Sequence, residues 1–357
     1  MKKRDFILLA AFVAIVLFAL VFIGRRDKSF LYQGKDPWQW AAQLQHPDPH
    51  AREVAKAAFR EMGTNALPML IRQLQFQESF TRKARVWLGK RLPGRFEKAV
   101  TSGMKPAFVS DIRAGAAFGL TELGTNAAPA TPMLLRAMRD SDGQVMWNSA
   151  TALGSVGEPA VPGLIKLLED PNPQLRHAAA YALGQTGSAA LPAASLLLRY
   201  ATDTNSAVSM SSLYALGNIG PAAGPVILRA VRESSGERRR AALKALTAIR
   251  PSRKSALPVL LEAAQDPDPV SRAAVIEALA TLNIREPSAI LIYVSALDDT
   301  NANVRVQAAK GLAMAASRGS NAIPKLVVLQ RTDPDDAVRI AAAEALVKIS
   351  SPASAKP

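Results

Sequence analysis

The sequence repeats itself at intervals of about 30 residues, and this periodicity limits the possible folds more than any other feature. A leucine marks each copy, with steps of 33, 30, 33, 30, 33, 33 and 34 residues between Leu120, Leu153, Leu183, Leu216, Leu246, Leu279, Leu312 and Leu346. One copy, Asn172–Leu198, reads as a capped helix, a glycine turn and a second helix near a proline. Such self-similarity predicts a solenoid, in which each unit buries its apolar face only against its neighbours.

Three further columns of the repeat have a physical interpretation. The residue before each marker is glycine or alanine, which lets two helices approach closely. Seven residues before the marker, six of the eight copies carry Arg113, Arg176, Arg239, Arg272, Arg305 or Arg339, whereas Met146 and Ser209 occupy the other two. Four residues earlier the column holds helix N-cap types, namely Asp142, Asn172, Asn205, Asp268, Asn301 and Asp335, with Ser235 as a weaker member. We interpret these columns as a ladder of caps and hydrogen bonds between repeats; the alternative is a charged binding track.

Segments such as DPDPVSRAAVIEALATL (266–282) and NANVRVQAAKGLA (301–313) resemble HEAT repeats, particularly the short bacterial HEAT-like repeats also found in phycobilin lyases. The resemblance extends from about Asp36 to Ile349. It implies an all-α fold, an α-α superhelix of about eight to nine helical repeats. It does not specify a function, because the family includes scaffolds, adaptors, lyases and DNA-repair enzymes.

The N-terminal region predicts a membrane anchor. After a basic tail (1–5), the uncharged run Phe6–Gly24 has 19 residues, which as a helix would span about 28 Å. No small-residue cleavage site follows it, so we expect an uncleaved signal anchor in preference to a cleaved signal peptide. The sequence thus predicts a single-pass protein of the bacterial inner membrane with the solenoid on the periplasmic side. Basic residues flank both ends of the run, so the opposite orientation stays open.

The remaining chain divides into a linker (25–35), a solenoid (36–350) and a short tail (351–357) that we expect to be disordered. Within the solenoid, 76–110 lacks the clean repeat and carries eight Lys and Arg residues against two Glu, from Arg82 to Lys105. This segment is either a degenerate basic repeat or an insert. It is also a second candidate for membrane contact, because a basic amphipathic segment can lie on anionic headgroups.

No pattern in the sequence predicts catalysis. The chain has no cysteine, which excludes disulfides, thiolate metal sites and a cysteine nucleophile. Its three histidines include His46 and His50, but prolines at 47 and 49 separate them, which argues against a helical two-histidine metal site. We therefore predict a protein that is not an enzyme and that binds no metal and no cofactor.

One column favours binding. The second helix of each repeat runs from apolar residues into one charged position, and five such positions in succession are basic: Arg72, Arg136, Lys166, Arg199 and Arg229, which we call the basic row. Glu262 follows them in register. In the solenoids that this sequence resembles, second helices line the concave face, so the basic row would form a positive stripe there. The alternative is a set of merely solvated positions.

The net charge of +15 also favours acidic partners. We predict a membrane-anchored, non-catalytic scaffold or adaptor whose concave face binds an acidic partner, most simply a protein. The first alternative is nucleic-acid binding, which requires a cytoplasmic solenoid. The second is an enzyme similar to the bilin lyases.

Overall fold

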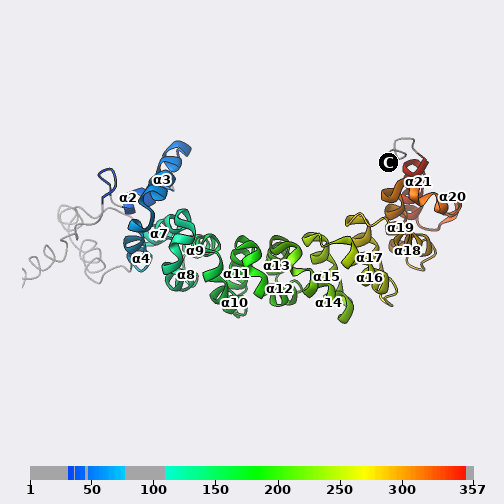
Figure 1. Cartoon of the computed structure of the whole chain (residues 1–357), viewed down its shortest axis with the longest axis horizontal. Helices are drawn as coiled ribbons and strands as arrows, with labels where there is room; N and C mark the ends of the chain where they lie inside the picture. The colour runs from blue at the N-terminus through cyan, green and yellow to red at the C-terminus, as the bar shows by residue number, and fades with distance from the viewer. Residues whose placement is uncertain (1–30, 36, 45–46, 77–108, 351–357) are drawn as a thin grey trace, which may run out of the picture. The chain divides into compact units, whose positions relative to one another are not determined.

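The computed structural model describes residues 31–35, 37–44, 47–76 and 109–350 (Figure 1). Within these ranges every extended element of regular structure is an α-helix or a 3-10 helix, and Tyr32 and Lys35 form an isolated β-bridge. The prediction of an all-α solenoid is therefore confirmed for the described residues. The chain separates into two compact units, Met1–Val156 and Gly157–Pro357.

The first unit contains the beginning of the repeat array. Its α-helices are α2 (Pro37–Gln43), α3 (Pro49–Met62), α4 (Leu67–Leu74), α7 (Val109–Leu123), α8 (Thr131–Ala137) and α9 (Gly143–Val156). A repeat has a first and a second helix, as in α3 and α4 or α7 and α8. The 3-10 helices η1 (Gly63–Ala66) and η2 (Gly124–Ala130) connect the first helix of a repeat to its second helix. Helices α2, α3 and α4 all contact α7, which in turn packs against α9. Consecutive first helices thus stack directly, as the small residues before the markers predict.

The second unit continues the pattern. Its α-helices are α10 (Val161–Leu168), α11 (Pro173–Gln185), α12 (Ala194–Tyr200), α13 (Ser206–Ile219), α14 (Gly224–Glu233), α15 (Gly236–Ile249), α16 (Arg253–Ala263), α17 (Pro269–Thr281), α18 (Pro287–Ala296), α19 (Ala302–Ala315), α20 (Ile323–Thr332) and α21 (Asp336–Ser350). Its 3-10 connections are η3 (Glu158–Ala160), η4 (Gly187–Ala193), η5 (Gly220–Ala223) and η6 (Ala316–Ala322). Each first helix packs against the next first helix, and each second helix packs against the first helix that follows it.

The cap column begins the first helices as expected. The side-chain oxygen of Asn172 accepts the backbone N–H of Gln174 at 3.0 Å, and Asp268 accepts those of Val270 and Ser271 at 3.1 and 3.2 Å. These bonds satisfy amides that have no partner inside the helix. Ser235, the weaker member of the column, makes no such bond.

The marker leucines form the core. Leu120, Leu153, Leu183, Leu216, Leu246, Leu279 and Leu312 are all 0% exposed. Leu346, in the last helix, is only half-buried, since no described repeat follows α21 to cover it. The core is therefore a continuous strip between stacked helix pairs and has no single centre.

The membrane localisation is corrected by the structure. No helix in the described part of the chain is long and apolar enough to cross a membrane. This finding contradicts the predicted single-pass inner-membrane protein, and the prediction is withdrawn. The run Phe6–Gly24 on which it was based lies outside the described residues, as does nearly all of the basic segment 76–110.

Candidate functional site

The basic row occupies one structural position in five second helices. Each member is the sixth residue of its helix, and all five side chains are exposed: Arg72 in α4, Arg136 in α8, Lys166 in α10, Arg199 in α12 and Arg229 in α14. A shared register on amphipathic helices gives these side chains the same orientation relative to the core strip. The first two belong to the first unit and the last three to the second unit.

Within the second unit, the row is only partly neutralised. Arg199 donates to Glu169 at 3.2 Å, and this pair is more than half exposed, so water screens it. The side chains of Lys166 and Arg229 have no ion pair or hydrogen-bond partner among the described residues. These two cations are therefore available to a ligand without breaking an internal contact.

The positive character ends one helix later. Glu262 of α16 stands in the row's register and pairs with Arg232 of α14 at 3.0 Å. Residues 229–254 are rich in Lys and Arg, and the half-buried arginines among them have a structural role. Arg239 pairs with Asp266, and Arg240 pairs with Asp268 at 2.8 Å. Only the exposed Lys and Arg side chains of residues 229–254 are accessible to a ligand, as the basic row is.

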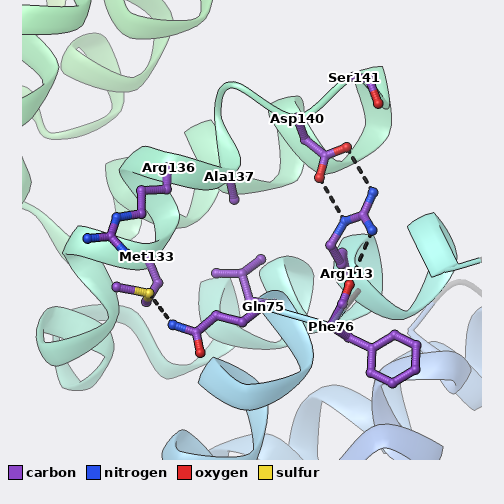
Figure 2. A pocket seen from close by; sticks show the side chains of 9 residues that line it. Gln75, Phe76, Arg113, Met133, Arg136, Ala137, Asp140 and Ser141 are labelled. Carbon is purple, nitrogen blue, oxygen red and sulfur yellow. Dashed lines mark hydrogen bonds and ion pairs between the residues drawn. The ribbon is translucent and has the colours of Figure 1, made fainter. Parts of the chain in front are cut away.

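Arg136 also lies at the edge of a cavity of about 520 Å³ in the first unit (Figure 2). Figure 2 shows Met133 on one side of the cavity and the ion pair of Arg113 with Asp140 on the other, and Leu74 also belongs to the lining. Arg113 is engaged on both sides: its Nη2 donates to Asp140 at 2.9 Å and its Nη1 to the carbonyl of Phe76 at 3.2 Å. The Arg136 side chain has no such partner in the described residues. The cavity therefore offers one free guanidinium beside an apolar wall, a combination suited to an acidic side chain and its aliphatic stem.

The ladder arginines have a structural role. Arg176 pairs with Asp203, Arg272 with Asp299 and Arg305 with Asp333, at 2.8 to 2.9 Å. Each aspartate belongs to the loop that precedes the next repeat, and the pairs are bidentate, which adds geometric specificity. Arg272 also donates from Nη1 to the carbonyls of Asp266 and Pro267 at 2.9 and 3.0 Å, before its own helix. One side chain thus joins two loops of consecutive repeats.

These pairs confirm the interpretation of the columns as a hydrogen-bond ladder between repeats. The sequence alone names no acceptor for the arginines; the structure shows that it is an aspartate 27 or 28 residues later. That aspartate also accepts the backbone N–H of the next cap, as Asp299 does from Asn301 at 2.9 Å. The Arg272 guanidinium holds the pKa of the Asp299 carboxyl below its ordinary value, and Arg305 does the same for Asp333. The recurrence of aspartate after each arginine was the signal that could have revealed the pairing.

A second cavity, of about 420 Å³, repeats this arrangement at Arg272 and Asp299. Its lining includes Ser295 at the position that Arg136 occupies in the first unit. The ion pair between repeats recurs in both cavities. Of these two linings, as far as the structure describes them, only the first contains a cation without a partner, Arg136.

Comparison with known proteins identifies the architecture. The family described as HEAT repeats matches residues 161–247, 225–292 and 292–357, which together make up more than half of the chain. The chain belongs to the HEAT-repeat family. This assignment confirms the resemblance read from the sequence. A comparison with curated proteins finds no match.

Three of the solved structures similar to this chain illustrate the range of the likeness. The CpcE–CpcF complex of phycocyanin lyase from Nostoc sp. PCC7120 is 21% identical, over 75% of this chain and 96% of that chain, with a TM-score of 0.33. Kap95p, in a structure with RanGDP, is 12% identical over 88% of this chain and 60% of its own, with a TM-score of 0.39. Kap121p bound to Nup53p is 13% identical over 89% and 42%, with a TM-score of 0.44. Likenesses of this size concern no more than the fold, and the activities and partners of these proteins do not transfer to this HEAT-repeat chain.

Proposed function

We propose that this HEAT-repeat protein is a non-catalytic scaffold that binds an acidic segment of a partner protein along its basic row. The observation that carries the proposal is the shared register of five exposed cations on successive second helices. Solvation alone requires a polar residue at this position but does not select a basic one. Within the second unit, the cations Lys166, Arg199 and Arg229 on successive second helices suit an extended chain that carries several carboxylates.

The availability of the charges supports binding over a structural role. Arg136, Lys166 and Arg229 have no internal acceptor in the described residues. The ladder arginines Arg176, Arg272 and Arg305, in contrast, pair with aspartates of the next repeat. Free guanidinium groups favour planar, bidentate recognition of carboxylates.

A charge-reversal experiment tests the proposal. The row variant carries Arg136→Glu, Lys166→Glu and Arg229→Glu. The matched control carries Arg238→Glu, Lys244→Glu and Lys254→Glu, which are also exposed and change the net charge equally but lie outside the row. Fluorescence anisotropy with a labelled peptide of about ten glutamates measures affinity, first at about 50 mM and then at about 500 mM NaCl.

We expect the row variant to bind the peptide at least tenfold more weakly than the control, with both melting like the wild type. Binding to the wild type should weaken steeply as salt rises, because exposed charges are screened. Equal losses in the two variants would show that net charge, and not the row, attracts the peptide. A single-stranded oligonucleotide that binds wild type more tightly than the peptide does, and that the row variant loses, would favour the nucleic-acid alternative.

A further inference from the structure

The column of the basic row changes its chemistry at the C-terminal end of the second unit. After Glu262, the same position holds Ser295 in α18 and Val328 in α20. One helical turn earlier, upstream second helices mostly carry a proline, whereas α18 carries Leu291 and α20 carries Pro324. Leu291 is 68% exposed and Val328 is 56% exposed. We call Leu291, Ser295, Pro324 and Val328 the apolar end.

Large apolar side chains are rarely exposed on the second helices of the repeats. Among the described residues, the second α-helices expose large hydrophobic side chains at Leu291 and Val328, and the other such residues lie on first helices, in connections or near element ends. At the position of Val328, five other second helices carry a cation. A lone exposed apolar side chain needs no explanation. Two on neighbouring second helices, one of them Val328 at a position that carries a cation in five other helices, indicate a contact surface.

Direct contacts place the apolar end on the same row of helices as the cations. Helix α12 contacts α14, α14 contacts α16 and α16 contacts α18. Lys325 of α20 then donates from Nζ to the carbonyl of Val294 in α18 at 3.2 Å and pairs with Asp298. Figure 1 shows α10, α12, α14 and α16 following one another along one side of the second unit. A ligand that follows this side passes from Lys166 and Arg229 to Leu291 and Val328.

We infer that one partner segment spans both parts, with carboxylates at the basic row and an apolar side chain seated on the apolar end. This inference rests on the proposed function and adds the chemistry and spacing of the partner. Adjacent packed helices lie about 8 to 10 Å apart, so α14 and α18 are separated by roughly 20 Å, which about six extended residues cover. Glu262 of α16 lies between them, 61% exposed in its side chain and paired with Arg232, so this helix offers no free cation in the row's register. The intervening residues of the partner therefore need no carboxylate.

Three labelled synthetic peptides test the inference against the full-length chain by fluorescence anisotropy. The first has an acidic block of four glutamates, a Gly-Ser spacer of about six residues and a Leu-Leu pair. The second replaces Leu-Leu by Ser-Ser, and the third shortens the spacer to about two residues. The protein variants are Leu291→Asn with Val328→Thr, and Ile340→Asn as a matched control, because Ile340 is 60% exposed but lies on α21, outside the row.

We expect the wild type and Ile340→Asn to bind the first peptide roughly tenfold more tightly than the second or third. The Leu291→Asn/Val328→Thr variant should bind all three equally. If the wild type binds the first and second peptides equally, and salt still weakens both, the inference is overturned and the proposed function stands. If no peptide binds, or if the row variant binds the first peptide as tightly as wild type, both are overturned.

Discussion

The ring of Tyr293 occupies the space that a side chain on Gly311 would need: a Cβ at position 311 would lie 2.5 Å from Cε1 of the ring. Tyr293 is 1% exposed and stands in α18 where other second helices carry leucine or isoleucine. A milder version occurs in the first unit, where a Cβ on Gly119 would lie 3.1 Å from Cζ of Phe59 in α3 and 3.2 Å from Cδ2 of Leu70 in α4. The two glycines of the small column are therefore matched to the two aromatic residues that pack on it.

This match predicts the effect of Gly311→Ala. The added methyl group collides with the buried ring, so we expect a loss of about 1 to 3 kcal/mol in the free energy of unfolding. Adding Tyr293→Leu recreates the leucine–alanine combination of the other repeats and should recover much of that loss. Chemical denaturation of the two single variants and the double variant measures the coupling. A double variant no more stable than Gly311→Ala would contradict the match.

The register of the core makes a second prediction. Leu279 and Leu216 are fully buried, so replacing either by alanine should cost about 2 to 5 kcal/mol. Because repeats couple mainly to their neighbours, hydrogen exchange should accelerate first in the affected repeat and the two beside it. Val270→Ala is the control, since Val270 is 52% exposed on α17 and its truncation should cost less than about 0.5 kcal/mol. If Val270→Ala lowered the free energy of unfolding as much as Leu279→Ala or Leu216→Ala does, this assignment of the core would be wrong.

Ala316 offers a stabilising substitution. It follows α19 with φ of 52°, in the region that favours glycine, and Gly63 and Gly220 occupy the corresponding place after α3 and α13 with φ of 52° and 73°. An L side chain is strained in this conformation, so Ala316→Gly should raise the free energy of unfolding by about 1 kcal/mol. Thermal melts of the two proteins measure the change. A lower melting temperature for the glycine variant would show that flexibility of the unfolded chain outweighs the relief of strain.

The ladder predicts a defined response to acid. The pKa of the Asp299 carboxyl is lowered by Arg272, so the stabilisation that this pair provides is complete above the ordinary pKa of about 3.9 and is lost as pH falls through the lowered value. Asp299→Asn removes the pair and should cost roughly 1 to 3 kcal/mol at neutral pH. The difference between wild type and variant should shrink below about pH 4. A difference that stays constant down to pH 2 would exclude the ionised pair as its source.

Arg272→Ala separates the ladder from the binding row. The change leaves Asp299 without its bidentate partner, so stability should fall by a similar amount. Because Arg272 is not in the basic row, affinity for the acidic peptide should stay within about twofold of wild type at a temperature where both are folded. A loss of affinity equal to that of the row variant would mean that the ladder arginines contact the partner.

Much of the local structure could be predicted from the order of residues alone. The spacing of the markers, the small residues beside them and the cap residues at Asn172 and Asp268 all act through short-range geometry, and each of these columns has its expected place. Helix periodicity and N-cap hydrogen bonds depend on residues within a few positions of one another, so a single sequence contains the information. The five exposed positions of the basic row follow from the same periodicity.

Tertiary structure decided which of these side chains are paired. Arg272 binds Asp299 and Arg199 binds Glu169, whereas Arg136 and Lys166 find no acceptor in the described residues, although all four are basic residues at repeated positions. Likewise, the sequence shows only that position 311 holds a small residue. The structure shows why it is glycine, because the Tyr293 ring occupies the space of a Cβ there. These contacts join residues 18 to 30 positions apart, and they form only because the stacking of helices brings separate repeats together. Local sequence rules determine the structure of each repeat. The separation and offset between successive repeats determine which side chains of one repeat contact those of the next.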